Sequence, residues 1–283
     1  MSYREELAIF GQKYPYQHRT IGKADFRFVL AGESGRQVLV FLNGGMNTSE
    51  MWMRYVEELS KDYRILLFDY PREFPTNQEL VTGMAAFFHA LGIRKPVLIG
   101  ASDGGMVAQI YTQKYPDDVG GLILISTGGM DAATIKGFKR KYFFAPVMLF
   151  YMKHCNYEKL KPTLVKAGLR HAEHESEADK AYARDMFTAI FEDYTKEKDV
   201  HITGLLIDLM NQTPVTEKTF CGLKNKILLI LPDKDWFSAE MQNNLTALMH
   251  EPKVYYVQGG HLSTILKSEE YICKIKTFLE SIR

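Results

Sequence analysis

Short runs of consecutive apolar residues alternate along this chain with segments in which apolar residues recur at helical spacing. The runs are typical of buried strands, and they cover residues 37–42, 65–68, 97–99, 122–125, 227–231 and 254–257. A sheet with one face in water would show alternating polar and apolar positions, which these runs lack. The pattern therefore predicts an α/β fold in which a mostly parallel sheet is covered by helices on both faces.

Two regions depart from this alternation. Near the N-terminus, residues 4–13 predict a short helix and residues 20–30 predict a β-hairpin. Later, residues 128–218 form a long helix-like segment that interrupts the strand pattern. We therefore expect one core built from residues 1–127 and 219–283.

The charges in the long interrupting segment are unevenly distributed. Residues 136–170 contain nine lysines or arginines and one acid, whereas residues 173–199 are dominated by acids. We interpret both as solvated helix faces that attract one another, in preference to an anion-binding surface. The segment also carries an apolar cluster that we expect to be core, with a pocket wall as the alternative. This cluster consists of Phe143, Phe144, Val147, Met148, Phe150, Tyr151 and Met152.

Composition limits the class of protein. With 283 residues, of which 46% are hydrophobic and 24% charged, the chain can bury a large core in one domain that carries an insertion. The net charge of +1 and the lack of a basic stripe with interleaved aromatics argue against a nucleic-acid partner, and nothing indicates the oligomeric state. A charged N-terminus and the lack of a long apolar span predict a cytoplasmic protein without a membrane span. Three scattered cysteines predict buried thiols and no disulfide framework.

The stretch V-L-I-G-A-S-D-G-G-M, residues 97–106, combines a buried strand, a sharp turn and the start of a helix. Ser102 stands at the turn, where a strained backbone exposes the hydroxyl at the edge of the sheet. Gly100 and Gly104 leave room for the strand and the helix to approach each other. The free N–H groups of the helix then face any anion that forms beside the serine.

A serine nucleophile needs a base and an acid that orients the base. His261 follows the strand at residues 254–257, and Asp235 follows the strand at residues 227–231, so both are expected at the same sheet edge as Ser102. We predict that these three residues form a catalytic triad. Two other acids compete with Asp235 for the third role, namely Asp233 and Asp131.

These motifs resemble the α/β-hydrolase family, and the likeness covers nearly the whole chain except residues 128–218. The family's nucleophile elbow matches residues 100–104, its acid loop matches residues 232–235, and its histidine loop matches residues 260–261. The order serine, acid, histidine along the chain is also that of the family.

The resemblance implies several further roles. The backbone N–H groups of Asp103 and Gly45 would hold the oxyanion, with Met46 as an alternative to Gly45. Residues 128–218 would form a helical cap, or lid, over the substrate. Met46 and Trp236 flank the site and are candidates for substrate binding, and no cofactor is implied.

Two segments depart from the family pattern. Asn43-Gly44-Gly45 stands where many members have His-Gly, and the Tyr70-Pro71 segment lacks the G-x-G-x-S loop that is common after the next strand. Capped members with a similar Tyr-Pro segment include maspardin-like proteins, some of which resemble binding scaffolds more than enzymes. A non-catalytic protein that binds a ligand or a partner is therefore an alternative.

The serine at the turn decides which hydrolase chemistry we expect. Epoxide hydrolases and haloalkane dehalogenases use a carboxylate at that position, and Asp103 stands one residue too late. We expect a serine hydrolase that cleaves a carboxylic ester of a small or medium acyl substrate through an acyl-enzyme. Hydrolysis of a thioester, an amide or a carbon–carbon bond by the same residues is the alternative.

A second group of polar residues lies in the long segment. His171, His174 and Glu175 have a spacing that would suit metal ligands on one helix face. No further ligand motif accompanies them, so we expect a solvated helix and no metal site.

Overall fold

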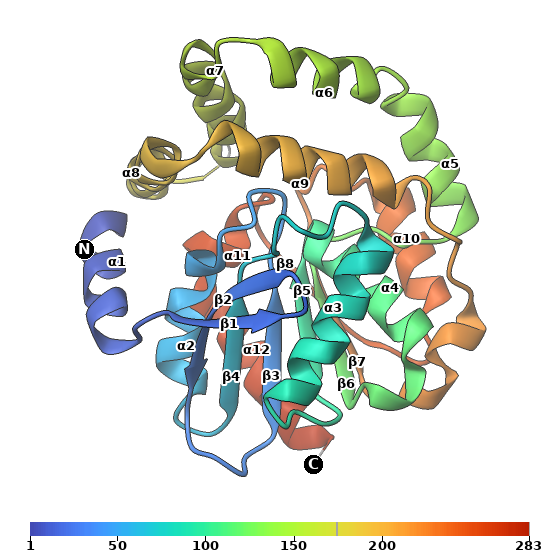
Figure 1. Cartoon of the computed structure of the whole chain (residues 1–283). Coiled ribbons are helices and arrows are strands. Elements are labelled where there is room, and N and C mark those ends of the chain that lie inside the picture. Colours follow the sequence, from blue (N-terminus) through green and yellow to red (C-terminus); the bar gives the residue numbers. More distant parts are fainter. Residues whose placement is uncertain (174, 283) are drawn as a thin grey trace.

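An eight-stranded sheet in the order β1-β2-β4-β3-β5-β6-β7-β8 forms the centre of the computed structural model, which describes residues 1–173 and 175–282 (Figure 1). β2 is antiparallel to its neighbours β1 and β4, and all other neighbouring strands are parallel. The predicted α/β fold with a mostly parallel sheet is therefore confirmed. The strands are β1 (Gln17–Ile21), β2 (Ala24–Ala31), β3 (Val38–Leu42), β4 (Arg64–Phe68), β5 (Val97–Ala101), β6 (Gly121–Ile125), β7 (Ile227–Pro232) and β8 (Lys253–Val257).

Helices cover both faces of the sheet, because successive side chains of a strand point to opposite faces and the central strands are apolar at every position. In β3, Val40 packs into the core on one face and Phe41 into the core on the other. The first face is covered by α3 (Asn77–Ala90), α4 (Asp103–Lys114) and α10 (Ala239–Leu248). The second face is covered by α2 (Met53–Leu59) and α12 (Ser268–Ser281), with α1 (Tyr3–Lys13) and the short α11 (Ser263–Leu266) on the same side.

The parallel strands β5 to β8 bring the loops that follow them to one edge of the sheet. The last residues of these strands lie opposite one another, with Ala101 beside Ile125 and Pro232 beside Val257. Loops that are far apart in the sequence therefore start next to each other in space.

Five helices, rather than one long helix, form the insertion between β6 and β7. In Figure 1 they lie above the edge at which β5 to β8 end, coloured from green to gold. Polar residues accept a hydrogen bond from the first turn of each of three of the helices and so start them: Asn156, Ser176 and Thr195. The helices are α5 (Ala132–Lys141), α6 (Ala145–His154), α7 (Tyr157–Leu169), α8 (Glu177–Asp193) and α9 (Lys196–Leu209).

The insertion leaves the sheet and returns to it at neighbouring points, because the N–H of Val215 donates to the carbonyl of Met130 at 2.9 Å. None of the described helices combines the length and the apolar character needed to cross a membrane.

The interpretation of the apolar cluster in the insertion as core is wrong for all members except Met152. Met152 is buried, but Phe143 and Val147 are 78% and 70% exposed. The physical reason is that α6 packs on α9 through its other face, so residues on its outer side meet no other element.

The expected attraction between the basic and the acidic parts of the insertion stays a prediction. Among the described residues, no ion pair joins residues 136–170 to residues 173–199. Acids of α8 instead bind the N-terminal helix, where Arg4 pairs with Asp185 at 3.1 Å and with Glu192 at 2.6 Å.

The cysteines are free, but the expectation that all are buried is wrong. Cys221 and Cys273 are exposed, and Cys155 is partly exposed. Cys155 directly follows α6, Cys221 lies in the 3-10 helix Glu217–Leu223, and Cys273 lies within α12.

Candidate active site

Ser102 lies at the turn between β5 and α4 in a strained backbone conformation, with φ at 54° and ψ at −123°. A side chain at Gly104 would place its Cβ 2.3 Å from the carbonyl oxygen of Leu42, so only glycine fits between α4 and β3. The hydroxyl of Thr127 donates to the Ser102 carbonyl at 2.6 Å and holds the turn from the β6 side. The local sequence thus fixes a serine side chain that projects from the sheet edge.

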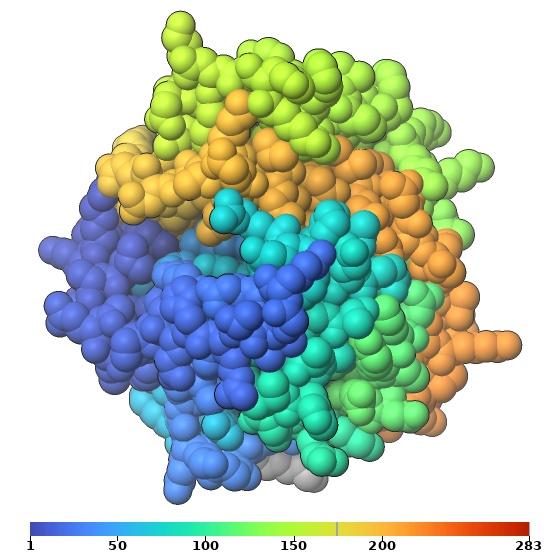
Figure 2. Space-filling model, in the orientation of Figure 1, coloured from blue at the N-terminus to red at the C-terminus, as the bar shows by residue number. Residues whose placement is uncertain are grey.

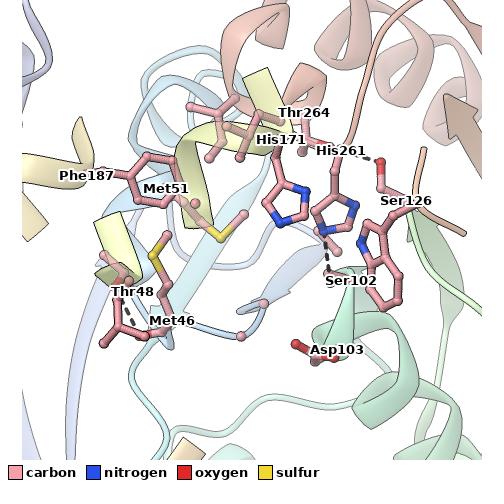
Figure 3. A pocket seen from close by; sticks show the side chains of 18 of the residues that line it. Met46, Thr48, Met51, Ser102, Asp103, Ser126, His171, Phe187, His261 and Thr264 are labelled. Atoms are coloured by element: carbon pink, nitrogen blue, oxygen red, sulfur yellow. Dashed lines mark hydrogen bonds between the residues drawn. The ribbon is translucent and has the colours of Figure 1, made fainter. Parts of the chain in front are cut away.

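His261 and Asp235 reach this serine from the loops after β8 and β7. The His261 Nε2 lies 3.1 Å from the Ser102 Oγ (Figure 3), and its Nδ1 lies 2.9 Å from the Asp235 Oδ1. In the tautomer that carries its proton on Nδ1, His261 donates to Asp235 and accepts from Ser102. This is the arrangement in which an imidazole can remove a proton from a hydroxyl.

The three candidate acids have different hydrogen-bond partners. Asp233 accepts from the N–H of Gly259 at 2.9 Å, and Asp131 accepts from the first turn of α5, which it caps. Of these acids, Asp235 is the one whose carboxylate contacts His261, and its side chain is fully buried. Its Oδ2 atom has no hydrogen-bond partner among the described residues.

A model of the α/β-hydrolase fold matches residues 37–150 of the chain. The enol-lactonase from Burkholderia xenovorans LB400 has a structure similar to this one, with a TM-score of 0.75 at 16% identity over 93% of this chain and 100% of that chain. The chain therefore has an α/β-hydrolase fold.

Relatives found by sequence match only part of this chain. Mouse epoxide hydrolase 4 is 30% identical over 111 residues, which are 36% of this chain and 31% of that protein. The human monoacylglycerol lipase ABHD6 is 27% identical over 149 residues, or 45% of this chain and 44% of that protein. The chain thus spans less than half the length of these relatives.

The glycine turn after β3 is held by residues that sequence reasoning did not select. The Asn43 side chain donates to the carbonyl of Phe68 at 2.8 Å and to the Asn47 side chain at 3.1 Å. Asn47 in turn accepts from the N–H of Tyr70 at 2.8 Å, and the Tyr70 hydroxyl donates to the Asn43 carbonyl at 3.0 Å. The two segments that depart from the α/β-hydrolase pattern therefore bind each other, and together they fix the turn.

Gly45 of this turn lies against the side chain of Asp103, which follows the serine. A Cβ at Gly45 would come within 2.8 Å of the Asp103 Oδ2. Burial raises the pKa of the Asp103 carboxyl to about 6, while His261 and the residue's own backbone N–H partly offset that effect. Asp103 is also the first residue of α4, where a backbone N–H has no acceptor within the helix.

A cavity of about 470 Å³ lies next to Ser102 and has mostly apolar walls. Met46 and Trp236, both singled out from the sequence, line it. The insertion contributes Leu164 and Phe187 to the opposite wall. This volume suits a small or medium organic ligand.

Two residues of the suspected metal group have other partners in the structure. His171 lines the cavity, with its ring 5.4 Å from that of His261, and the two rings lie side by side in Figure 3. Burial, and then the neighbouring His261, lower the pKa of His171. The Glu175 carboxylate instead accepts a hydrogen bond from the N–H of Gly260 at 2.9 Å. His174 lies outside the described residues.

Proposed function

We propose that this α/β-hydrolase is a serine hydrolase that cleaves the carboxylic ester of a small or medium acyl substrate. The observation that carries the proposal is the continuous contact from Asp235 through His261 to the Ser102 hydroxyl. The apolar cavity beside that hydroxyl supports an acyl group as the part of the substrate that is bound. Met46 and Trp236 are the proposed contacts to the substrate, and residues 128–218 are the proposed lid.

The proposed reaction proceeds in two halves. The Ser102 oxygen bonds to the ester carbonyl carbon while its proton passes to the His261 Nε2, and the oxyanion is held by the N–H groups of Gly45 and Asp103. Collapse of this intermediate expels the alcohol, which takes the proton from His261. Water then repeats the sequence on the acyl-enzyme, releasing the acid and restoring Ser102. Each oxyanion donor is worth about 3 kcal/mol in comparable sites.

Epoxide opening, which the name of one group of relatives suggests, is not proposed here for this chain. That chemistry uses a carboxylate nucleophile, whereas the group in contact with the base is the Ser102 hydroxyl. Asp103 presents its side chain to Gly45 and not to the histidine nitrogen.

Ester turnover tests the proposal. The protein is incubated with p-nitrophenyl acetate, butyrate and octanoate, and labelling by a fluorophosphonate probe is followed by mass spectrometry. We expect turnover and stoichiometric labelling of Ser102, and a loss of turnover in Ser102→Ala of at least about a thousandfold. Equal turnover by Ser102→Ala would refute the role of this serine, and absent labelling of the folded protein would favour a binding scaffold.

A further inference from the structure

The outer side of α6 and the residues just before it form an apolar surface on the insertion. Ten large apolar side chains of the described chain are strongly exposed, and six of them lie within residues 143–151. Helix α6 and the residues just before it lie at the top of the molecule in Figure 2, where they are yellow-green. We call these side chains the outer apolar patch: Phe143, Phe144, Val147, Met148, Phe150 and Tyr151.

This patch is not explained by packing within the chain. Helix α6 packs on α9, where the buried Met152 contacts Thr203. Its outer side is apolar as well, with Phe150 65% exposed. A helix that is apolar all round is normally covered all round, by protein or by lipid. An exposed patch of this kind on a folded monomer marks a surface that meets another apolar phase.

Cations without ion-pair partners lie on the helix that carries the patch and on the helices before and after it. Among the described residues, none of these side chains has a carboxylate within ion-pair distance, and all are exposed on α5, α6 or α7: Lys136, Lys139, Arg140, Lys153, Lys159 and Lys166. Residues 136–170 as a whole hold nine basic residues and one acid. The patch therefore belongs to a strongly basic part of the chain.

We propose that the outer apolar patch docks on an anionic lipid surface. Aromatic and aliphatic side chains would enter the boundary between headgroups and acyl chains, while the cations of these helices contact the anionic headgroups. A second copy of this chain fits the outer apolar patch less well than a lipid surface does. In a symmetric dimer the patch meets itself, so two strongly basic parts of the chain would come together.

The patch also directly follows, in the sequence, residues at the cavity wall. Tyr142, which lines the cavity, directly precedes Phe143, and the ammonium of Lys141 lies 5.4 Å from the ring centre of Trp236, another lining residue. A docked molecule would thus receive an ester that has partitioned into the lipid without passing it through water. This last step rests on the proposed function, whereas docking itself does not involve the triad.

Vesicle flotation tests the docking. The full chain and its Ser102→Ala variant are mixed with vesicles of phosphatidylcholine, with or without phosphatidylglycerol, and the protein that floats is quantified. We expect both proteins to bind the vesicles that contain phosphatidylglycerol much more strongly. Binding by Ser102→Ala separates this proposal from the hydrolase activity, because either one can fail alone.

Two pairs of variants identify the surface. Replacing Lys136, Lys139 and Arg140 with glutamine is expected to weaken binding on the order of a hundredfold, because each cation near an anionic surface contributes about fivefold. The matched control replaces Arg94, Lys95 and Lys226, which lie at the opposite edge of the sheet. Phe143→Ser with Phe150→Ser is expected to weaken binding at least about tenfold, because apolar area is no longer buried. Its control is Ile9→Ser with Tyr256→Ser, two exposed apolar residues elsewhere.

Three results would overturn the proposal. The first is that the folded wild-type chain does not float with either vesicle. The second is that the control variants lose as much binding as the patch variants. The third is that light scattering shows a wild-type dimer that Phe143→Ser with Phe150→Ser converts to a monomer, without vesicle binding by either, which would assign the patch to contact between copies.

Discussion

The Asp103 carboxyl is held beside the candidate nucleophile in surroundings that disfavour its charge. Its pKa of about 6 in the folded chain lies above the ordinary 3.8, so the folded state binds the proton more tightly than the unfolded state does. The folded chain therefore loses stability as the pH rises from about 4 to about 6. Above that range the full penalty is present, and it is on the order of 3 kcal/mol.

Replacing this carboxyl with an amide removes the penalty. We expect Asp103→Asn to be more stable than the wild type by on the order of 3 kcal/mol near pH 8 and nearly equal to it near pH 4, as measured by urea unfolding. Asp117→Asn, at an exposed aspartate, is the matched control. A stability difference that is the same at both pH values would contradict the burial of the Asp103 charge.

Single residues also mark the limit of prediction from the sequence. The position of Ser102 and His261 at one sheet edge followed from their place after strands, because parallel strands end together. The choice between Asp233 and Asp235 did not follow from this rule, since both stand in the same loop. It depends on the path of the loop after β8, which gives Asp233 the Gly259 N–H and leaves Asp235 facing the imidazole.

At the scale of elements, the insertion contacts the loop that carries His261. Between α7 and α8, Glu175 accepts from the Gly260 N–H at 2.9 Å and pairs with Lys267 at 3.2 Å, and its side chain is only 3% exposed. We expect Glu175→Ala to lower the rate of fluorophosphonate labelling at Ser102 by about tenfold or more, because a buried N–H without an acceptor destabilises the loop by about 1–3 kcal/mol.

The matched variants separate this hydrogen bond from the ion pair. Glu175→Gln keeps an oxygen acceptor for Gly260. Lys267→Met removes the ion pair and the hydrogen bond from Lys267 to the Gln258 carbonyl, but leaves the bond from Gly260 to Glu175. Both variants are expected to label at close to the wild-type rate. Thermal unfolding shows whether each variant is folded at the assay temperature. If all three variants label like the wild type, Glu175 does not position the histidine loop.

Elements also show why some sequence expectations failed. The apolar cluster in α6 was interpreted as core because most core helices are apolar, yet exposure depends on which neighbours a helix has. The Asn43 and Tyr70 departures looked like losses from the family pattern, but each is the hydrogen-bond partner of the other. Both errors concern contacts between distant segments, which the pattern of apolar residues does not contain.

The whole molecule is nearly neutral but strongly polarised. Residues 136–170 carry a net charge of +8, so the remaining residues of the chain, whose total is +1, carry −7. Two of the acids of α8, Asp185 and Glu192, pair with Arg4 of α1. The net charge of the whole chain therefore conceals the separation between a basic stretch and an acidic remainder.

Cation-exchange chromatography makes this polarity measurable, because a resin binds the most positive face of a protein and not its average charge. We expect the wild type to be retained at neutral pH despite its net charge of +1. The variant without Lys136, Lys139 and Arg140 should elute at lower salt than the variant without Arg94, Lys95 and Lys226, although both lose the same charge. Equal elution of the two variants would mean that the cations of the insertion do not act together as one surface, and the electrostatic part of lipid docking would fall with them.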